Sequence, residues 1–161
     1  MPPTAILWEL FPATTGVHGI AFISALGKGY VSCGRLNSIT VFDLKTYAVL
    51  KQIPVGQNPD AIMYEPFSKM IITCNGRSNN LSMVDPQTDT VVSTIPLSGK
   101  PETAVSDETG KIFVNIEDKN SISAVDISAG KVLDTWNLAP GGRSNRPGHR
   151  FKNKKVICRL R

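Results

Sequence analysis

The chain has 161 residues, of which 41% are hydrophobic and 19% are charged, which is enough for one ordinary domain with a core. The formal charge of +5 is unevenly placed. Before Gly141 there are 10 Lys and Arg against 13 Asp and Glu, and the other 8 basic residues follow it. The basic character therefore belongs to the last residues, and we do not expect the main part of the chain to bind nucleic acid. The sequence has no apolar run of about eighteen residues, so it predicts no membrane-spanning helix. Residues 1–14 lack the pattern of a secretory signal.

A repeat of about 42 residues runs through the sequence. Gly34-Arg35 aligns with Gly76-Arg77, and Pro59-Asp60 aligns with Pro101-Glu102, both 42 residues apart. Three aspartates recur in the same way, at spacings of 42 and 41: Asp43, Asp85 and Asp126. A fixed period of about 40 residues is typical of propeller blades and other repeat units.

Each unit contains four short segments that predict β-strands, because apolar and β-branched residues alternate between Gly, Pro and Asp turns. In the first unit we expect strands at 17–22, 30–33, 38–43 and 48–55. In the second unit they fall at 60–64, 70–74, 80–84 and 90–97. In the third they fall at 102–106, 111–115, 121–125 and 131–138. No segment has a convincing helical period.

Four short antiparallel strands per unit predict an all-β fold made of β-propeller blades. The expected blades are residues 16–57, 58–99 and 100–140, after a remnant of a preceding blade at 1–15 and before a basic tail at 141–161. Propellers usually close with about 4–8 blades. We therefore expect a partial, open propeller that is marginally stable and prone to self-association through its open flanks.

Several motifs carry a family resemblance. Tyr30-Val31-Ser32-Cys33, Ile39–Asp43 and Ile53–Gly56, together with Asn58–Ile62 and Asn75–Ser78, resemble the YVTN repeat of bacterial β-propellers, the YncE-like proteins. The resemblance covers residues 16–140. It implies a propeller binding module and, for the intact relative, export to the periplasm.

The last residues, 141–161, do not continue the repeat. Codons can be chosen for residues 142–160 that, read one base later, encode an apolar strand, an Asp turn and a second strand, as a fourth blade would require. We therefore interpret the tail as a frameshift product without order. The alternative is a genuine basic tail that binds nucleic acid or anionic membrane.

The candidate ligand-binding residues lie where two loops of each blade meet at one rim. The loop into the innermost strand places one group near the axis, and the loop between the second and third strands places another beside it. Such loops on a rigid scaffold often bind ligands, although the same residues also stabilise turns. The candidates are His18, Arg35, Asp60, Arg77, Glu102 and Asp118. We expect Asp43, Asp85 and Asp126 to be structural turn residues.

The sequence favours a non-enzymatic binding module for an unknown protein or small molecule, with no catalytic residues, no metal and no cofactor. His18 is the only histidine before the tail, and no phosphate-binding or dinucleotide-binding motif is present. The alternative is a propeller enzyme, lactonase-like or quinoprotein-like, whose active site lies partly in missing blades. Cys33 and Cys74 lie one residue out of phase in equivalent strands, so we expect buried thiols and no disulfide between them.

Overall fold

The computed structural model describes residues 14–138, which form three four-stranded antiparallel sheets. Sheet 1 contains β1 (Val17–Ile23), β2 (Lys28–Cys33), β3 (Ser38–Asp43) and β4 (Val49–Pro54). Sheet 2 contains β5 (Pro59–Glu65), β6 (Met70–Asn75), β7 (Asn80–Asp85) and β8 (Thr90–Pro96). Sheet 3 contains β9 (Pro101–Ser106), β10 (Lys111–Ile116), β11 (Ser121–Asp126) and β12 (Lys131–Asn137).

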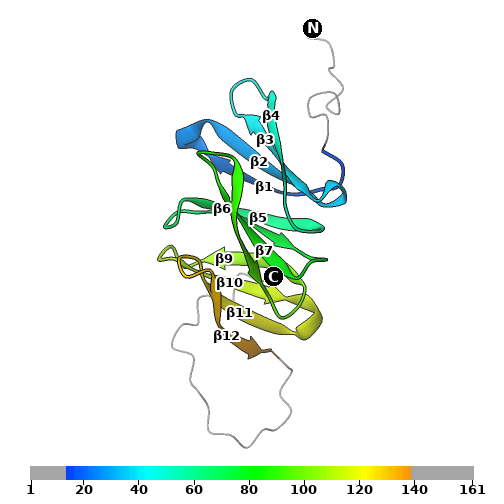
Figure 1. Ribbon diagram of the computed structural model, residues 1–161, viewed down its shortest axis with the longest axis vertical. Helices are drawn as coiled ribbons and strands as arrows, with labels where there is room; N and C mark the ends of the chain where they lie inside the picture. Colours follow the sequence, from blue (N-terminus) through cyan, green and yellow to red (C-terminus); the bar gives the residue numbers. More distant parts are fainter. Residues whose placement is uncertain (1–13, 139–161) are drawn as a thin grey trace, which may run out of the picture.

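The strands of each sheet follow one another in chain order, and the three sheets are stacked along the long axis of the molecule (Figure 1). The all-β, blade-like fold is confirmed, and every strand lies within two residues of its expected position. In the described range the remaining regular elements are three short 3₁₀ turns: η1 (Ser24–Leu26), η2 (Gly34–Leu36) and η3 (Glu117–Lys119). Of the expected blade remnant at 1–15 only the last two residues are described, and the expected basic tail at 141–161 lies wholly outside the described range.

Each sheet places residues of positive φ at equivalent turns. The turn between the second and third strands uses asparagine every time, at Asn37, Asn79 and Asn120. Asparagine tolerates the left-handed conformation better than most other non-glycine residues. The corresponding residues after the first strand are Gly27, Lys69 and Gly110, and after the third strand they are Tyr47, Asp89 and Gly130. The repeat is therefore a repeat of backbone conformation as well as of sequence.

Lys69 occupies a left-handed position, with φ of 59°, where the other two sheets use glycine. We expect Lys69→Gly to raise the free energy of unfolding by about 1 kcal/mol. A non-glycine residue in the left-handed conformation costs about 1–2 kcal/mol, and the greater entropy of glycine in the unfolded chain offsets part of the gain from removing that cost. Urea unfolding followed by circular dichroism measures the change. Gly27→Ala is the matched control, since a Cβ there meets no atom within 4 Å and only the backbone changes. We expect it to lower stability by about 1 kcal/mol, and a loss of stability in Lys69→Gly would contradict the argument.

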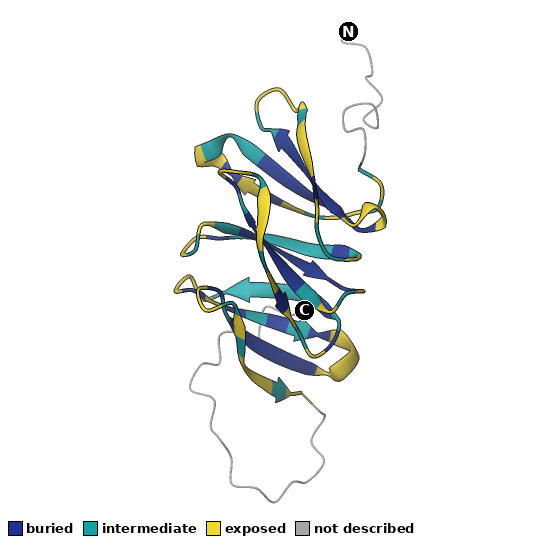
Figure 2. Ribbon diagram, viewed as in Figure 1, coloured by how far each residue is buried: buried dark blue, intermediate teal, exposed yellow. Residues whose placement is uncertain are grey.

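The two faces of a sheet pack against different neighbouring sheets, as sheet 2 shows. We call the face toward the next sheet in the chain the leading face and the other the trailing face. Successive strand residues point to opposite faces, and Ile71 and Ile72 show this: Ile71 packs toward sheet 1 and Ile72 toward sheet 3. Buried residues accordingly run through the middle of each sheet (Figure 2).

Two apolar cores join the sheets. The leading face of sheet 1 meets the trailing face of sheet 2 in a core of Ala21, Ile23, Tyr30, Ile39, Val41, Ile53, Ile71 and Val84. The leading face of sheet 2 meets the trailing face of sheet 3 in a core of Ile72, Cys74, Leu81, Met83, Ile95, Ile112, Val114, Ile116, Val125 and Ile127. Each buried aliphatic side chain contributes about 1.5–3 kcal/mol. The joints between sheets therefore hold the described part of the chain together.

The thiols follow the same alternation. Cys33 lies in the small cluster with Val31 and Phe42 on the trailing face of sheet 1, and Cys74 lies in the core between sheets 2 and 3. Both are buried and they form no disulfide with each other, as the sequence predicts. Burial raises the pKa of Cys74 to about 12, so this thiol stays protonated.

Candidate functional site

The innermost strands β1, β5 and β9 lie side by side and begin at one rim of the molecule (Figure 1). Their second residues are His18, Asp60 and Glu102, so three polar side chains start from equivalent places. His18 Nδ1 lies 3.4 Å from Asp60 Oδ1, and the two side chains are 42% and 34% exposed. This arrangement brings His18 and Asp60 together and leaves both accessible from solvent. We call His18, Asp60 and Glu102 the axial group.

Gly34, the first residue of the repeated Gly-Arg pair, makes room for His18. A Cβ on Gly34 would lie 2.8 Å from His18 Nε2, so only glycine lets the imidazole rest against the backbone there. A Cβ on Gly76, the equivalent residue, would lie 3.4 Å from Lys100 Cε. Gly34 therefore has a local reason to precede Arg35, whereas a Cβ on Gly76 would make only ordinary contacts.

Lys100 lies beside the axial group, although the sequence did not single it out. Its ammonium group pairs with the Glu117 carboxylate, and both side chains are partly exposed. The pKa of Lys100 is raised, mainly by its hydrogen bond to Glu117, and the charges of Asp60 and Glu102 add to this effect. Glu102 also accepts a hydrogen bond from Asn115 Nδ2, at 3.0 Å. Lys100 thus pairs with Glu117 and lies close enough to the axial carboxylates for their charge to act on it, and its place directly before Pro101-Glu102 was the available signal.

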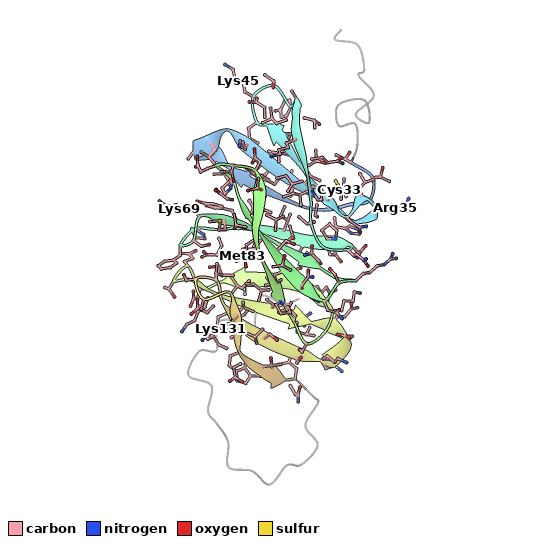
Figure 3. The ribbon with its side chains drawn as sticks, in the orientation of Figure 1. Cys33, Arg35, Lys45, Lys69, Met83 and Lys131 are labelled. Carbon is pink, nitrogen blue, oxygen red and sulfur yellow. The ribbon has the colours of Figure 1, made fainter. Side chains whose placement is uncertain are left out.

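The three loop residues predicted beside the axial group are not equivalent in the structure. Arg35 and Arg77 are exposed and form no ion pair with any residue in the range 14–138. Arg35 lies at the rim opposite Lys69 and Lys131 (Figure 3). Asp118 instead accepts a hydrogen bond from the Lys100 backbone N–H at 2.7 Å, which fixes the loop before β9. Two guanidinium groups are therefore available to a ligand, and Asp118 has a structural contact.

The turn aspartates behave differently from the axial carboxylates. Asp43 Oδ1 accepts hydrogen bonds from the backbone N–H groups of Lys45 and Thr46, at 2.9 and 2.7 Å. The Thr46 contacts lower the pKa of Asp43. Asp85 and Asp126 accept backbone hydrogen bonds in the equivalent turns, from Gln87 and Ala129. These residues are structural, as the sequence predicts.

A groove of about 450 Å³ lies between sheets 1 and 2, away from the axial group. Ile23, Leu26, Tyr64 and Met70 supply apolar lining, and the turn that contains Asp85 forms one edge. The polar residues around it belong to turns. The groove therefore lacks the convergent charged groups that the axial rim has.

In the described range no three His, Cys, Asp or Glu side chains gather closely enough to hold a metal ion. That same range contains no helix long and apolar enough to cross a membrane.

Comparisons with known proteins support the fold. No protein-family model matches the sequence, and no curated protein matches it either. Among solved structures, the chain is similar to Kuenenia stuttgartiensis hydrazine synthase, with a TM-score of 0.72 and 19% sequence identity. The match covers 88% of this chain and 40% of that chain, so this chain spans about two fifths of the length of the protein it resembles. Three four-stranded sheets and this likeness identify a β-propeller-like fold.

Proposed function

We propose that the chain is a non-enzymatic binding module, three blades of a YVTN-type propeller of the YncE-like kind, which binds a polar ligand at the axial rim. One observation carries the proposal: His18, Asp60 and Glu102 occupy equivalent, solvent-accessible places on neighbouring strands. The turn aspartates, in contrast, are occupied by backbone N–H groups.

The charges of the rim suggest the kind of ligand. The axial group supplies two carboxylates, and Arg35 and Arg77 supply two exposed guanidinium groups from the adjoining loops. Guanidinium groups bind carboxylates in a fork, and carboxylates bind ammonium groups. A ligand that carries both charges, such as a short peptide, fits this pattern better than a purely anionic one.

An enzyme is the second candidate. The similar structure is a hydrazine synthase, and the match covers only 40% of that chain. The axial group holds one histidine and two carboxylates, so in this reading further blades would supply the remaining reactive groups. The resemblance to YncE-like proteins also suggests export to the periplasm for the intact protein, which fractionation of producing cells would test.

Titration with probe peptides tests the binding proposal. We expect a Lys- and Glu-containing tripeptide to shift the amide NMR signals of β1, β5 and β9, and the double variant Asp60→Asn/Glu102→Gln to weaken binding by about tenfold or more, since each loses a charged contact. Asp85→Asn is the matched control, because it removes one carboxylate at the opposite groove. Spermidine, which carries only positive charges, and citrate, which carries only negative ones, serve as probes of one charge sign. Binding that depends on Asp85 and not on the axial carboxylates would contradict the proposal, as would the absence of binding by every probe.

A further inference from the structure

Two sheet faces of the described chain have no neighbouring sheet within it: the trailing face of sheet 1 and the leading face of sheet 3. On the first, Ile20 and Phe22 are 52% and 54% exposed. They point away from the face that carries Ala21 and Ile23, the neighbours in β1 that point into the core with sheet 2. On the second, Phe113 stacks on Trp136, with ring centroids 6.2 Å apart. Phe113 points to the other face from its neighbours in β10, Ile112 and Val114, which point into the core with sheet 2.

We propose that a second copy of this chain covers both faces, with the leading face of sheet 3 of each copy packed on the trailing face of sheet 1 of the other. A leading face already packs on a trailing face twice within the chain, between sheets 1 and 2 and between sheets 2 and 3. The contact between copies is a third use of the same joint. The proposed contact between copies therefore continues, between chains, the series of interfaces that the structure shows within the chain.

The residues at the joint between sheets 1 and 2 show what the contact between copies contains. There, Lys28 Nζ lies 2.7 Å from Asp89 Oδ2, and the Tyr30 hydroxyl donates to Asp89 Oδ1 at 3.0 Å. One repeat earlier than Asp89 stands Tyr47. Two repeats later than Tyr30 stands Phe113.

The polar contact of the inner joint is thus replaced at the outer faces by two aromatic residues. Phe113 of one copy meets Tyr47 of the other, where Tyr30 meets Asp89 within the chain. Aromatic pairs contribute beyond the area they bury. Tyr47 is 54% exposed and has φ of 60°, a place where sheet 3 has Gly130. A bulky residue is costly in this conformation, and the Tyr47 side chain is mostly exposed within the described chain. The proposed contact between copies gives this side chain a role.

Two copies also fit the closure of a propeller. Six sheets lie within the usual range of about 4–8 blades, and a two-fold axis pairs both outer faces at once. The rim is completed in the same step, because each copy contributes its own His18, Asp60 and Glu102 around the axis. The inference concerns assembly and stands apart from the ligand proposed above.

Sedimentation velocity and light scattering on the full chain test this assembly. We expect a species of about 35 kDa, twice the chain mass of 17.4 kDa, that gives no larger species as the concentration rises. A chain that stays at 17.4 kDa would overturn the proposal and leave the faces to another occupant, such as further blades of a longer protein. Open-ended polymers would overturn it as well, because the ring would not close.

Two sets of variants separate the proposed contact from other forms of association. We expect Phe113→Asp to give single chains, and Val92→Asp, at an equally apolar site that is 52% exposed on β8, to leave the dimer intact. Tyr47→Asp alone should weaken the dimer. The double variant Tyr47→Asp/Phe113→Tyr should restore it. Together with Lys111, the two new side chains would then reproduce the contact that Lys28 and Tyr30 make with Asp89. A dimer insensitive to Phe113→Asp, or a double variant no better than Tyr47→Asp, would contradict the proposed face.

Discussion

Glu65→Gln should lower the free energy of unfolding by about 3 kcal/mol, because a fully buried carboxylate accepts every hydrogen bond offered to it. Its two oxygens accept from the Phe67 backbone N–H at 3.2 Å, the Ser106 hydroxyl at 2.9 Å, and both the backbone N–H and the hydroxyl of Ser68 at 2.6 Å. Glutamine keeps one acceptor oxygen and turns an NH₂ group toward the remaining donors. Ser106 belongs to β9, so the change weakens the joint between sheets 2 and 3 as well as the turn after β5. Chemical unfolding at neutral pH measures the loss.

The control for Glu65 is Asp43→Asn. Asp43 also accepts three hydrogen bonds within a turn, from Lys45 and from the N–H and hydroxyl of Thr46, but it is only partly buried, whereas Glu65 is fully buried. Asparagine replaces aspartate readily in such turns. We expect a much smaller loss there than at Glu65. Equal losses at the two sites would show that burial is not the cause.

The pH dependence of the Glu65 effect has a defined sign. Burial by itself would raise the pKa of Glu65, but the hydrogen bonds from Ser68, Ser106 and Phe67 outweigh it and the pKa is lowered. A group with a lowered pKa in the folded state stabilises the protein above its unfolded pKa, about 4.3 for Glu, and that stabilisation disappears as the pH falls through the folded pKa. The difference in stability between the wild type and Glu65→Gln should therefore shrink in acid. A difference that grows as the pH falls would contradict this assignment.

The strands were predictable because they depend on local pattern. The alternation over residues 38–43 places β3 at its observed bounds, and the Asp turns end strands where the chain must reverse. The repeat also shows that its units are alike. It does not show which side of a strand faces which neighbour, and the opposite directions of Ile71 and Ile72 follow only from the stacking of the sheets.

The positions of the candidate residues were predictable, and their contacts were less so. Equivalent places on successive innermost strands put His18, Asp60 and Glu102 at one rim, as the sequence suggested. Sequence alone could not show that Asp118 points at a backbone N–H group while Asp60 points at His18. Such differences depend on the direction of a side chain within a loop. The role of Lys100 was missed for the same reason.

Contacts between sheets were the least predictable feature. Lys28 and Asp89 are 61 residues apart, and neither residue type nor spacing marks them as partners. At the equivalent places in sheets 3 and 1 stand Lys111 and Tyr47, so the repeat itself does not preserve the pair. Such a contact becomes visible only when the sheets are placed side by side.

Asp89→Ala should lower the free energy of unfolding by about 2–3 kcal/mol, because it removes the anion from a partly buried ion pair between sheets 1 and 2. The Lys28 and Asp89 side chains are only 20% and 13% exposed. Lys28 would keep its hydrogen bond to the Pro86 carbonyl oxygen, at 2.9 Å, but lose its counter-charge. The Tyr30 hydroxyl, whose pKa is raised by burial and by the hydrogen bond to Asp89, would lose its acceptor. Alanine also tolerates the φ of 52° at this position poorly.

Asp89→Asn separates the charge from the backbone, since asparagine tolerates positive φ and keeps one oxygen for Tyr30. We expect it to cost about half as much as Asp89→Ala, since only the charged part of the contact is lost. A double-mutant cycle of Lys28→Met with Asp89→Asn should then give a coupling energy of about 1 kcal/mol, because the two groups contact each other directly. Added salt should change that coupling little, because the pair is shielded from solvent. A coupling near zero would mean that packing and backbone conformation, and not this ion pair, hold sheets 1 and 2 together at the rim opposite the axial group.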